Sequence, residues 1–266
     1  MIAAGCSRGC GPTSCGSATT PACPSCARCG ARARGSRDAR GAGRVRAALY
    51  WAPEATDPLH ALGSAWLGRD AETAALVPQP GLPGIAELTA APRGYGLHAT
   101  LKPPFRLTQP YVALRGAVAG FAGRTRPFAL PPLAVMDLKG FLALRETAPC
   151  PPLHALAEAA VQSLDAFRAP ADEAELARRR RAGLSPAQAA MLARWGYPYV
   201  MAEWQFHVTL TRRLAPAEHA AVLPTLLAHF GTVPGTPRLV TELCLFTQMA
   251  PGAPFLIAER FPLRGT

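Results

Sequence analysis

Two copies of one short pattern carry the side chains of this sequence that could perform acid–base chemistry. His98-Ala-Thr100-Leu and His207-Val-Thr209-Leu both read His-x-Thr-Leu and lie in separate halves of the chain. Alternate side chains of an extended strand share a face, so each histidine points to the same side as its threonine. If both pairs meet in one cleft, one imidazole could deprotonate water while the other protonates the leaving oxygen of a phosphate ester. The threonine hydroxyls could donate hydrogen bonds to the phosphate oxygens.

The same alternation places one further polar side chain after each motif. Lys102 and Thr211 each follow the motif threonine by two positions, so we expect both on the face of the histidines, with the lysine offsetting phosphate charge. We assign substrate binding to Lys102, Thr211, Tyr95 and Tyr197. No group of carboxylates stands at metal-ligand spacing, so we expect neither a metal ion nor another cofactor.

Other candidate residues have a simpler interpretation. Four histidines fall in expected helices and are interpreted as surface or interface positions: His60, His154, His219 and His229. The run Arg178–Arg181 favours a solvated helix end over an anion-steering patch beside the cleft, because cations stabilise the negative pole of a helix. Trp195, Tyr197 and Tyr199 favour a core position over a stacking wall for a sugar or a base.

Hydrophobic periodicity and turn residues predict the elements that must position the motifs. We expect strands at 46–51, 95–107, 126–133, 134–144, 203–214, 238–248 and 255–262, the second cut short by Pro103-Pro104. We expect helices at 58–67, near 85–89, and at 152–167, 171–180, 185–195 and 215–230. Each motif then lies in a half built of strands and helices, which predicts an α+β class with a duplicated, two-lobed architecture around a central cleft.

Composition divides the chain near residue 45. Residues 1–44 contain no Leu, Val, Phe, Tyr or Trp, so we expect them to be disordered or a non-native N-terminal extension, with initiation at Val45 as the alternative. A zinc site on Cys23-x-x-Cys26-x-x-Cys29 is less favoured, because structural zinc sites usually need two well-separated cysteine pairs. Residues 45–266 are expected to form the two-lobed domain, with lobes at roughly 45–125 and 126–266 and the chain free to cross between them.

Charge and hydropathy exclude several classes of protein. The net charge is +11, but seven arginines and one aspartate in residues 1–44 account for +6 of it. The remaining +5 suits an anionic ligand without indicating a protein that coats nucleic acid. No run of eighteen apolar residues and no apolar leader occurs, so we expect a cytoplasmic protein with no membrane partner. No oligomeric state is predicted.

Six stretches resemble the two-histidine phosphoesterase superfamily, whose signature is a repeated His-x-Thr/Ser-apolar motif, one per lobe. More narrowly, they resemble the branch encoded in bacterial phosphonate-utilisation operons. The stretches are ALYWAP (48–53), GSAWLGRD (63–70), YGLHATLKPPF (95–105), GFLAL (140–144), WGYPY (195–199) and FHVTLT (206–211). The resemblance runs through 45–266 and implies a bilobal fold with a central cleft and phosphodiesterase activity, often on cyclic phosphates. Its catalytic positions here are His98, Thr100, His207 and Thr209.

These observations predict a metal-independent phosphoric diester hydrolase. Its expected partner is a small phosphorylated substrate, a cyclic phosphate ester such as a sugar cyclic phosphate of phosphonate metabolism. One alternative is an RNA 2′,3′-cyclic phosphodiesterase or RNA end-processing enzyme, which a basic, aromatic-lined groove would favour. The other is a non-catalytic nucleotide-binding module, which would not need two proton-transfer groups.

Overall fold

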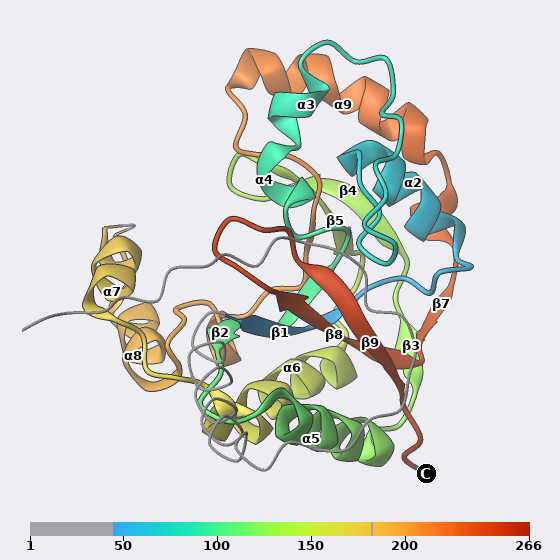
Figure 1. Ribbon diagram of the computed structural model, residues 1–266. Helices are drawn as coiled ribbons and strands as arrows, with labels where there is room; N and C mark the ends of the chain where they lie inside the picture. Colours follow the sequence, from blue (N-terminus) through green and yellow to red (C-terminus); the bar gives the residue numbers. More distant parts are fainter. Residues whose placement is uncertain (1–44, 182) are drawn as a thin grey trace, which may run out of the picture. The chain divides into compact units, whose positions relative to one another are not determined.

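Nine strands form the framework of the computed structural model, which describes residues 45–181 and 183–266 (Figure 1). The strands are β1 (Arg46–Trp51), β2 (Ala99–Arg106), β3 (Phe128–Leu130), β4 (Leu133–Asp137), β5 (Leu142–Glu146), β6 (Val208–Thr209), β7 (Arg238–Val240), β8 (Glu242–Gln248) and β9 (Leu256–Pro262). Seven of them form one antiparallel sheet in the order β4-β5-β6-β2-β1-β8-β9, and β3 pairs with β7. The two motif strands, β2 and β6, are therefore neighbours. The extension expected at 1–44 and its zinc alternative lie outside the described residues.

Helices connect these strands, and local capping signals fix several of their ends. The α-helices are α2 (Pro58–Leu67), α3 (Ile85–Leu88), α4 (Ala90–Arg93), α5 (Tyr111–Arg124), α6 (Pro151–Ser163), α7 (Glu173–Arg180), α8 (Pro186–Trp195) and α9 (Pro216–Phe230). Short 3-10 turns are η1 (Asp165–Phe167), η2 (Met201–Glu203) and η3 (Val233–Gly235). The Asp57 side chain caps α2 by accepting from the Leu59 amide, and Gly68 ends it in the left-handed conformation at φ 80°.

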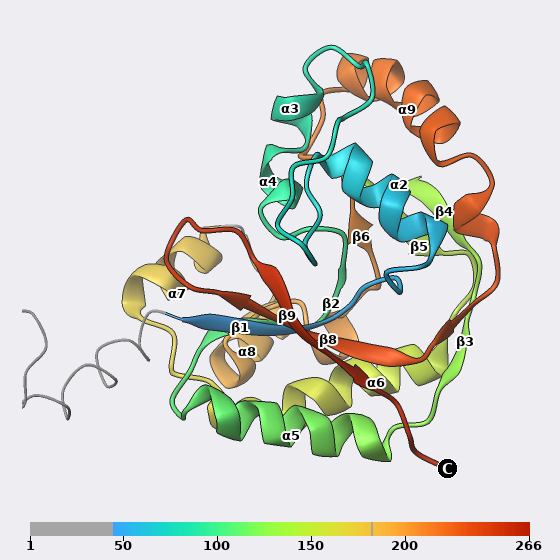
Figure 2. The same cartoon turned by 45° about the vertical axis from the view of Figure 1, so that its right-hand side comes forward.

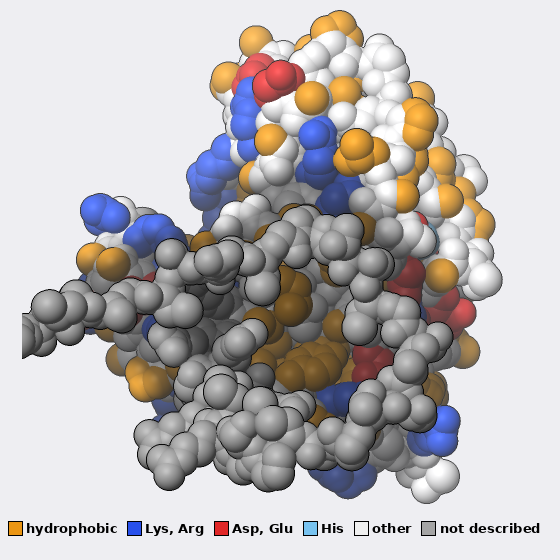
Figure 3. Space-filling model, in the orientation of Figure 1, with side chains coloured by type: hydrophobic (Ala, Val, Ile, Leu, Met, Phe, Trp, Pro, Cys, Tyr) orange, Lys and Arg blue, Asp and Glu red, His pale blue; other side chains and the backbone are white. Residues whose placement is uncertain are grey.

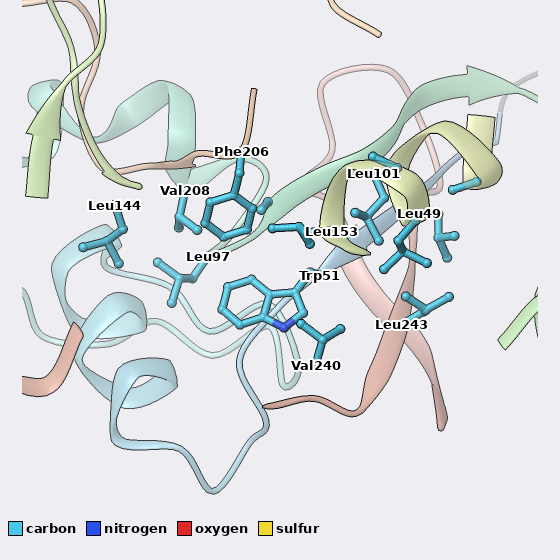
Figure 4. Close-up of a cluster of buried hydrophobic side chains, with 14 of the residues drawn as sticks. Leu49, Trp51, Leu97, Leu101, Leu144, Leu153, Phe206, Val208, Val240 and Leu243 are labelled. Carbon is cyan, nitrogen blue, oxygen red and sulfur yellow. The ribbon is translucent and has the colours of Figure 1, made fainter. Parts of the chain in front are cut away.

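Two pairs of helices cover the two ends of the sheet. Helix α5 packs against β8 and β9 and its neighbour α6 packs against β2, whereas α2 and α9 pack together near β4 and β5 (Figures 1 and 2). Both pairs contribute to one continuous hydrophobic core. In this core Leu49, Leu101 and Val208 of the central strands lie near Leu153 of α6 (Figure 4). Alternation along each strand turns the intervening side chains to the opposite face.

Strand β2 departs from the expected pattern because it continues through its prolines. Its pairing with β1 shifts register between Ala47 and Leu49 and again between Leu49 and Tyr50. Pro103 and Pro104 fall at the first shift, where the ladder is already interrupted, so their missing N–H groups cost no ladder bond. The expectation that these prolines cut the strand short was wrong.

The joint between the two motif strands is narrow. Strand β6 pairs with β2 through a single residue pair, Ala99 and Val208. On its other side the Thr209 and Val208 pairs with β5 are extended by the Leu210 amide, which donates to the Leu142 carbonyl at 2.9 Å. The Trp204 indole N–H donates to the Thr100 carbonyl at 2.7 Å, so a side chain supplies a bond that the short ladder lacks.

The expected α+β class is confirmed, with local differences. The span 134–144 holds the β4–β5 hairpin rather than one strand, and most of the strand expected at 203–214 is irregular. Helix α5 was not predicted, since its three glycines weaken the helical pattern. The division into lobes at 45–125 and 126–266 remains a prediction. Within the described ranges, no helix combines the length and apolarity that crossing a membrane requires.

Candidate active site

The pairing of β2 with β6 brings the two motifs face to face. Ala99 lies opposite Val208 in an antiparallel ladder. Continuing this register by one residue in each direction places His98 opposite Thr209 and Thr100 opposite His207. Each histidine therefore neighbours the threonine of the other motif. Diagonal neighbours on such a ladder are typically about 7–8 Å apart, which leaves room for a phosphate between the two imidazoles.

Both imidazoles are oriented by the same backbone bond. Nδ1 of His98 lies 2.9 Å from the Gly96 carbonyl, and Nδ1 of His207 lies 2.9 Å from the Gln205 carbonyl. A carbonyl can only accept, so each Nδ1 carries the proton and donates it. The Nε2 of each neutral ring is then left with a lone pair for proton transfer.

His98 lies in the more enclosed environment. Its ring stacks on the buried Tyr50 ring, with centroids 3.9 Å apart. Burial lowers the pKa of His98 to about 4, with a further contribution from His207 and an opposing one from the bond to Gly96. His98 is therefore neutral near pH 7.

His207 has a different set of neighbours. The Phe141 ring meets it edge-on, with centroids 5.9 Å apart. Burial lowers the pKa of His207 as well, opposed by the bond to Gln205 and assisted by Arg145. The sequence repeat thus has the same backbone support at both sites but different side-chain surroundings.

The four motif side chains line one cavity of about 490 Å³. Its other polar lining residues are Arg46, Tyr50, Tyr95, Arg178, Arg179, Tyr197 and Thr211. Within the described part of the chain, no aspartate or glutamate lines this cavity. A cavity with arginines and hydroxyl donors but no carboxylate is suited to an anion.

Lys102 does not line this cavity, so the expectation that its side chain lies on the face of the histidines was wrong. Its side chain is 2% exposed, and Nζ donates to the Val161 carbonyl at 3.0 Å and to Asp165 at 3.4 Å. The physical reason is the register shift in β2: Leu49 pairs with Lys102 and the next residue, Tyr50, pairs with Thr100. The extra residue turns Lys102 toward α6, away from the face of Thr100.

The other three expected binding residues line the cavity in different ways. Thr211 is buried, and its hydroxyl accepts a hydrogen bond from the Leu142 amide at 3.0 Å, which ties it to β5. Tyr95 is 37% exposed and stacks on Phe255, with centroids 5.1 Å apart. Tyr197 lies under the Arg179 guanidinium at 4.6 Å, so it forms a wall rather than part of the main core.

Four polar lining residues were not predicted as part of the site. Tyr50 and Arg46 belong to β1, which the sequence indicated only as a strand. Arg178 and Arg179 belong to α7, where the solvated-end interpretation was preferred to anion steering. Their places in the cavity lining agree with the second interpretation. The arginine run was the available signal, whereas nothing local in β1 indicates that it borders His98.

A second hollow of about 260 Å³ adjoins the first and shares Thr100, Tyr197 and His207 with it. Its remaining lining mixes the aromatic rings of Phe141, Tyr199 and Trp204 with polar and charged side chains. His207 therefore lies between the carboxylate-free cavity and a second hollow of mixed lining. Among residues 45–181 and 183–266, no three His, Cys, Asp or Glu side chains are grouped as a metal site would require.

A family model and several known proteins are similar to this chain. A family model described as "Protein of unknown function (DUF1045)" matches residues 100–256. A curated protein of Janthinobacterium sp. (strain Marseille), named ribose 1,5-bisphosphate phosphokinase PhnN, is 38% identical over 232 residues, which cover 83% of this chain and 51% of that protein. The protein of the same name in Laribacter hongkongensis (strain HLHK9) is 37% identical over 219 residues, covering 81% and 51%. The chain thus spans about half the length of these curated relatives.

Solved structures with a similar arrangement show low sequence identity. E. coli LigT in complex with 3′-AMP is 17% identical, with a TM-score of 0.42 and coverage of 83% of this chain and 98% of that one. TT0787 of Thermus thermophilus is 21% identical, with a TM-score of 0.35 and coverage of 64% and 79%.

Proposed function

The chain belongs to the DUF1045 family, and from that premise we propose that it is a phosphoesterase that hydrolyses a small cyclic phosphate ester without a metal ion. One observation carries the proposal. Two histidines with free Nε2 atoms and two threonines line a carboxylate-free cavity that also holds arginines. This set supplies a base, an acid and donors for phosphate oxygens.

The reaction needs only these groups and water. A water oxygen attacks phosphorus while Nε2 of one histidine takes its proton. The bond from phosphorus to one ester oxygen breaks, and Nε2–H of the other histidine, as imidazolium, protonates that oxygen. The product is a phosphate monoester with a free hydroxyl. Thr100 and Thr209 donate to the non-bridging oxygens as charge develops.

The surroundings of the two histidines separate their roles. His98 has the pKa of about 4, so it is the neutral ring that takes the proton from water. His207 then acts as the acid. Its Nδ1–H stays bonded to the Gln205 carbonyl, and Nε2–H faces the leaving oxygen. A bound phosphate anion favours the imidazolium form and raises the pKa of His207 in the complex.

The names of the curated relatives support a phosphorylated sugar as substrate. Those proteins are named for ribose 1,5-bisphosphate, and this chain matches about half of each. The only lysines of this chain, Lys102 and Lys139, do not stand in the Gly-x-x-x-x-Gly-Lys-Ser/Thr pattern that cradles ATP phosphates. A sugar cyclic phosphate of phosphonate metabolism fits both the site and these names.

A panel of cyclic phosphates tests the proposal directly. Sugar and nucleoside cyclic phosphates are incubated with the protein after chelator treatment, and phosphate monoester is measured. We expect turnover that survives the chelator and is lost in His98→Gln and His207→Gln. His219→Gln is the matched control, since His219 lies on α9 beside Asp137, outside the cavity. Activity that requires an added divalent ion, or that persists in either motif variant, would contradict the mechanism.

A second candidate, hydrolysis of an RNA 2′,3′-cyclic phosphate end, is favoured by two aromatic rings in the adjoining hollow. Phe141 and Trp204 line it and could stack a base beside His207. The same panel decides between the two. A higher kcat/KM for an oligonucleotide ending in a cyclic phosphate than for every sugar cyclic phosphate would establish the RNA activity instead.

A further inference from the structure

We propose that the cavity has a second anion site, formed by Arg46, Arg178 and Arg179, that holds a phosphate monoester carried by the substrate. The inference rests on the proposed phosphoesterase function and narrows its substrate class. The substrate would then carry the cyclic ester at one end and a separate phosphate group at the other.

The cavity is large enough for a substrate with more than one phosphate group. Its volume is about 490 Å³, within the range of roughly 300–1,000 Å³ typical of sites for whole small molecules. The four motif side chains, two histidines and two threonines, can hold one phosphodiester. The arginines belong to β1 and α7, not to the motif strands, so they line a different part of the wall.

Arg178 is the most available of the three cations. Its side chain is exposed on α7, and no ion pair with it is found among the residues that the structure describes. Its neighbours in the chain are different: Arg179 pairs with Glu175 and Arg180 pairs with Glu173. Basic side chains gather over α7 on the visible face (Figure 3). An unpaired guanidinium at a cavity wall is a ready bidentate partner for phosphate.

Arg46 is held in place with donors to spare. One terminal nitrogen donates to Gln248 at 3.2 Å, and the guanidinium lies over the Phe255 ring at 5.5 Å. A guanidinium has five N–H donors, so this single bond leaves the others for a ligand. Arg46 and Arg178 also line the next hollow, of about 360 Å³, so both lie where the two hollows adjoin.

Arg179 is the third cation of the site and is held in a fixed orientation. Its guanidinium stacks over Tyr197 and is fixed by Glu175 at 2.6 Å, and its side chain is 15% exposed. Its Nε is buried and has no hydrogen-bond partner among the described residues.

Binding of two stable nucleotides tests the site apart from catalysis. Calorimetry compares adenosine 3′,5′-bisphosphate with adenosine 3′-monophosphate on the full chain. We expect the bisphosphate to bind about 10- to 100-fold more tightly, since hydrogen bonds to charged groups are the strong ones. Arg178→Gln should remove most of this gain, and Arg46→Gln should reduce it. Arg180→Gln is the matched control, because Arg180 is one helix position away from the cavity-lining pair and bonded to Glu173.

Equal affinity for the two nucleotides would overturn the proposal. An equal loss in Arg180→Gln and Arg178→Gln would also overturn it, since that result indicates a general field rather than a site. Turnover provides a second measurement. Adenosine 2′,3′-cyclic phosphate that carries a 5′-phosphate should have a lower KM than the same ester without it, and Arg178→Gln should raise that lower KM. Failure of the proposed function has a separate signature, namely no turnover of either ester together with an intact bisphosphate preference.

Discussion

The two motif regions share a sequence pattern and a backbone bond, but their side-chain surroundings differ. His98 is stacked on a buried tyrosine, whereas His207 meets Phe141 edge-on and lies between two hollows. Both rings donate Nδ1–H to the carbonyl two residues earlier. The repeat therefore specifies orientation, and residues outside the repeat specify acidity. This division explains how two like motifs can take unlike chemical roles.

Removing either imidazole tests the comparison most strongly. His98→Ala and His207→Ala should each lower kcat by about 10²–10⁴-fold, the usual contribution of a general acid or base. The fold-reduction of kcat in the double variant should be much smaller than the product of the two single fold-reductions, because the two groups act in one step. Single-turnover rates with folding checked by circular dichroism provide the measurement. A variant with nearly full activity would show that the two regions are not a catalytic pair.

The pH profile of kcat/KM should show which region supplies the base. Activity should rise as His98 loses its proton near its pKa of about 4. It should fall on the alkaline side as His207 loses its proton, at a pH below the ordinary value of about 6.5, because burial lowers that pKa too. The profile of kcat should extend to higher pH, since bound phosphate raises the pKa of His207. An acidic limb above pH 6.5 would reverse the assignment.

Tyr50→Leu should reduce the difference between the two regions by opening the surroundings of His98. The tyrosine ring encloses His98, so its loss admits water and moves the pKa of His98 toward its ordinary value. The acidic limb of kcat/KM should shift upward while the alkaline limb stays in place. Phe141→Leu is the matched change beside His207 and should affect the alkaline limb instead. Equal shifts of both limbs in both variants would contradict separate environments.

Removing either threonine hydroxyl should lower kcat/KM by a similar amount, and by less than removing a histidine does. Thr100→Val and Thr209→Val each remove one neutral donor to a phosphate oxygen, worth about 0.5–1.5 kcal/mol. We expect similar losses of kcat/KM from both, roughly two- to tenfold. A loss confined to one threonine would show that the phosphate is held by one motif alone.

Lys102→Met should have the smallest effect on turnover, because Lys102 lies outside the cavity. Burial lowers its pKa from 10.5 to about 8, so between these values the unfolded chain binds more protons than the folded one. Wild-type stability should therefore rise with pH from about 8 toward 10. The free energy of unfolding, measured by denaturant titration across this range, should lose that rise in the variant. A large fall in kcat would restore Lys102 to the site.

Local signals predicted much of this fold, and distant pairings account for what they missed. Asp57, Pro58 and Gly68 fixed both ends of α2 because capping depends on neighbours in the chain. The motif residues were found by repetition. The register shift that turns Lys102 away depends on β1, and a strand does not encode its partner's register locally. The contact of Tyr50 with His98 has the same origin.

The narrow joint at β6 has a mechanical consequence. His98 belongs to the β2 motif and His207 to the β6 motif. The two strands are connected by the Ala99–Val208 pair and by the hydrogen bond from the Trp204 indole. The distance between the proton donor and acceptor is therefore set by the least reinforced connection in the sheet. A phosphate that contacts residues of both motif strands adds a further connection between β2 and β6. Amide hydrogen exchange at Val208 and Thr209 should accordingly slow when phosphate binds, while exchange in β1 and β8 stays unchanged.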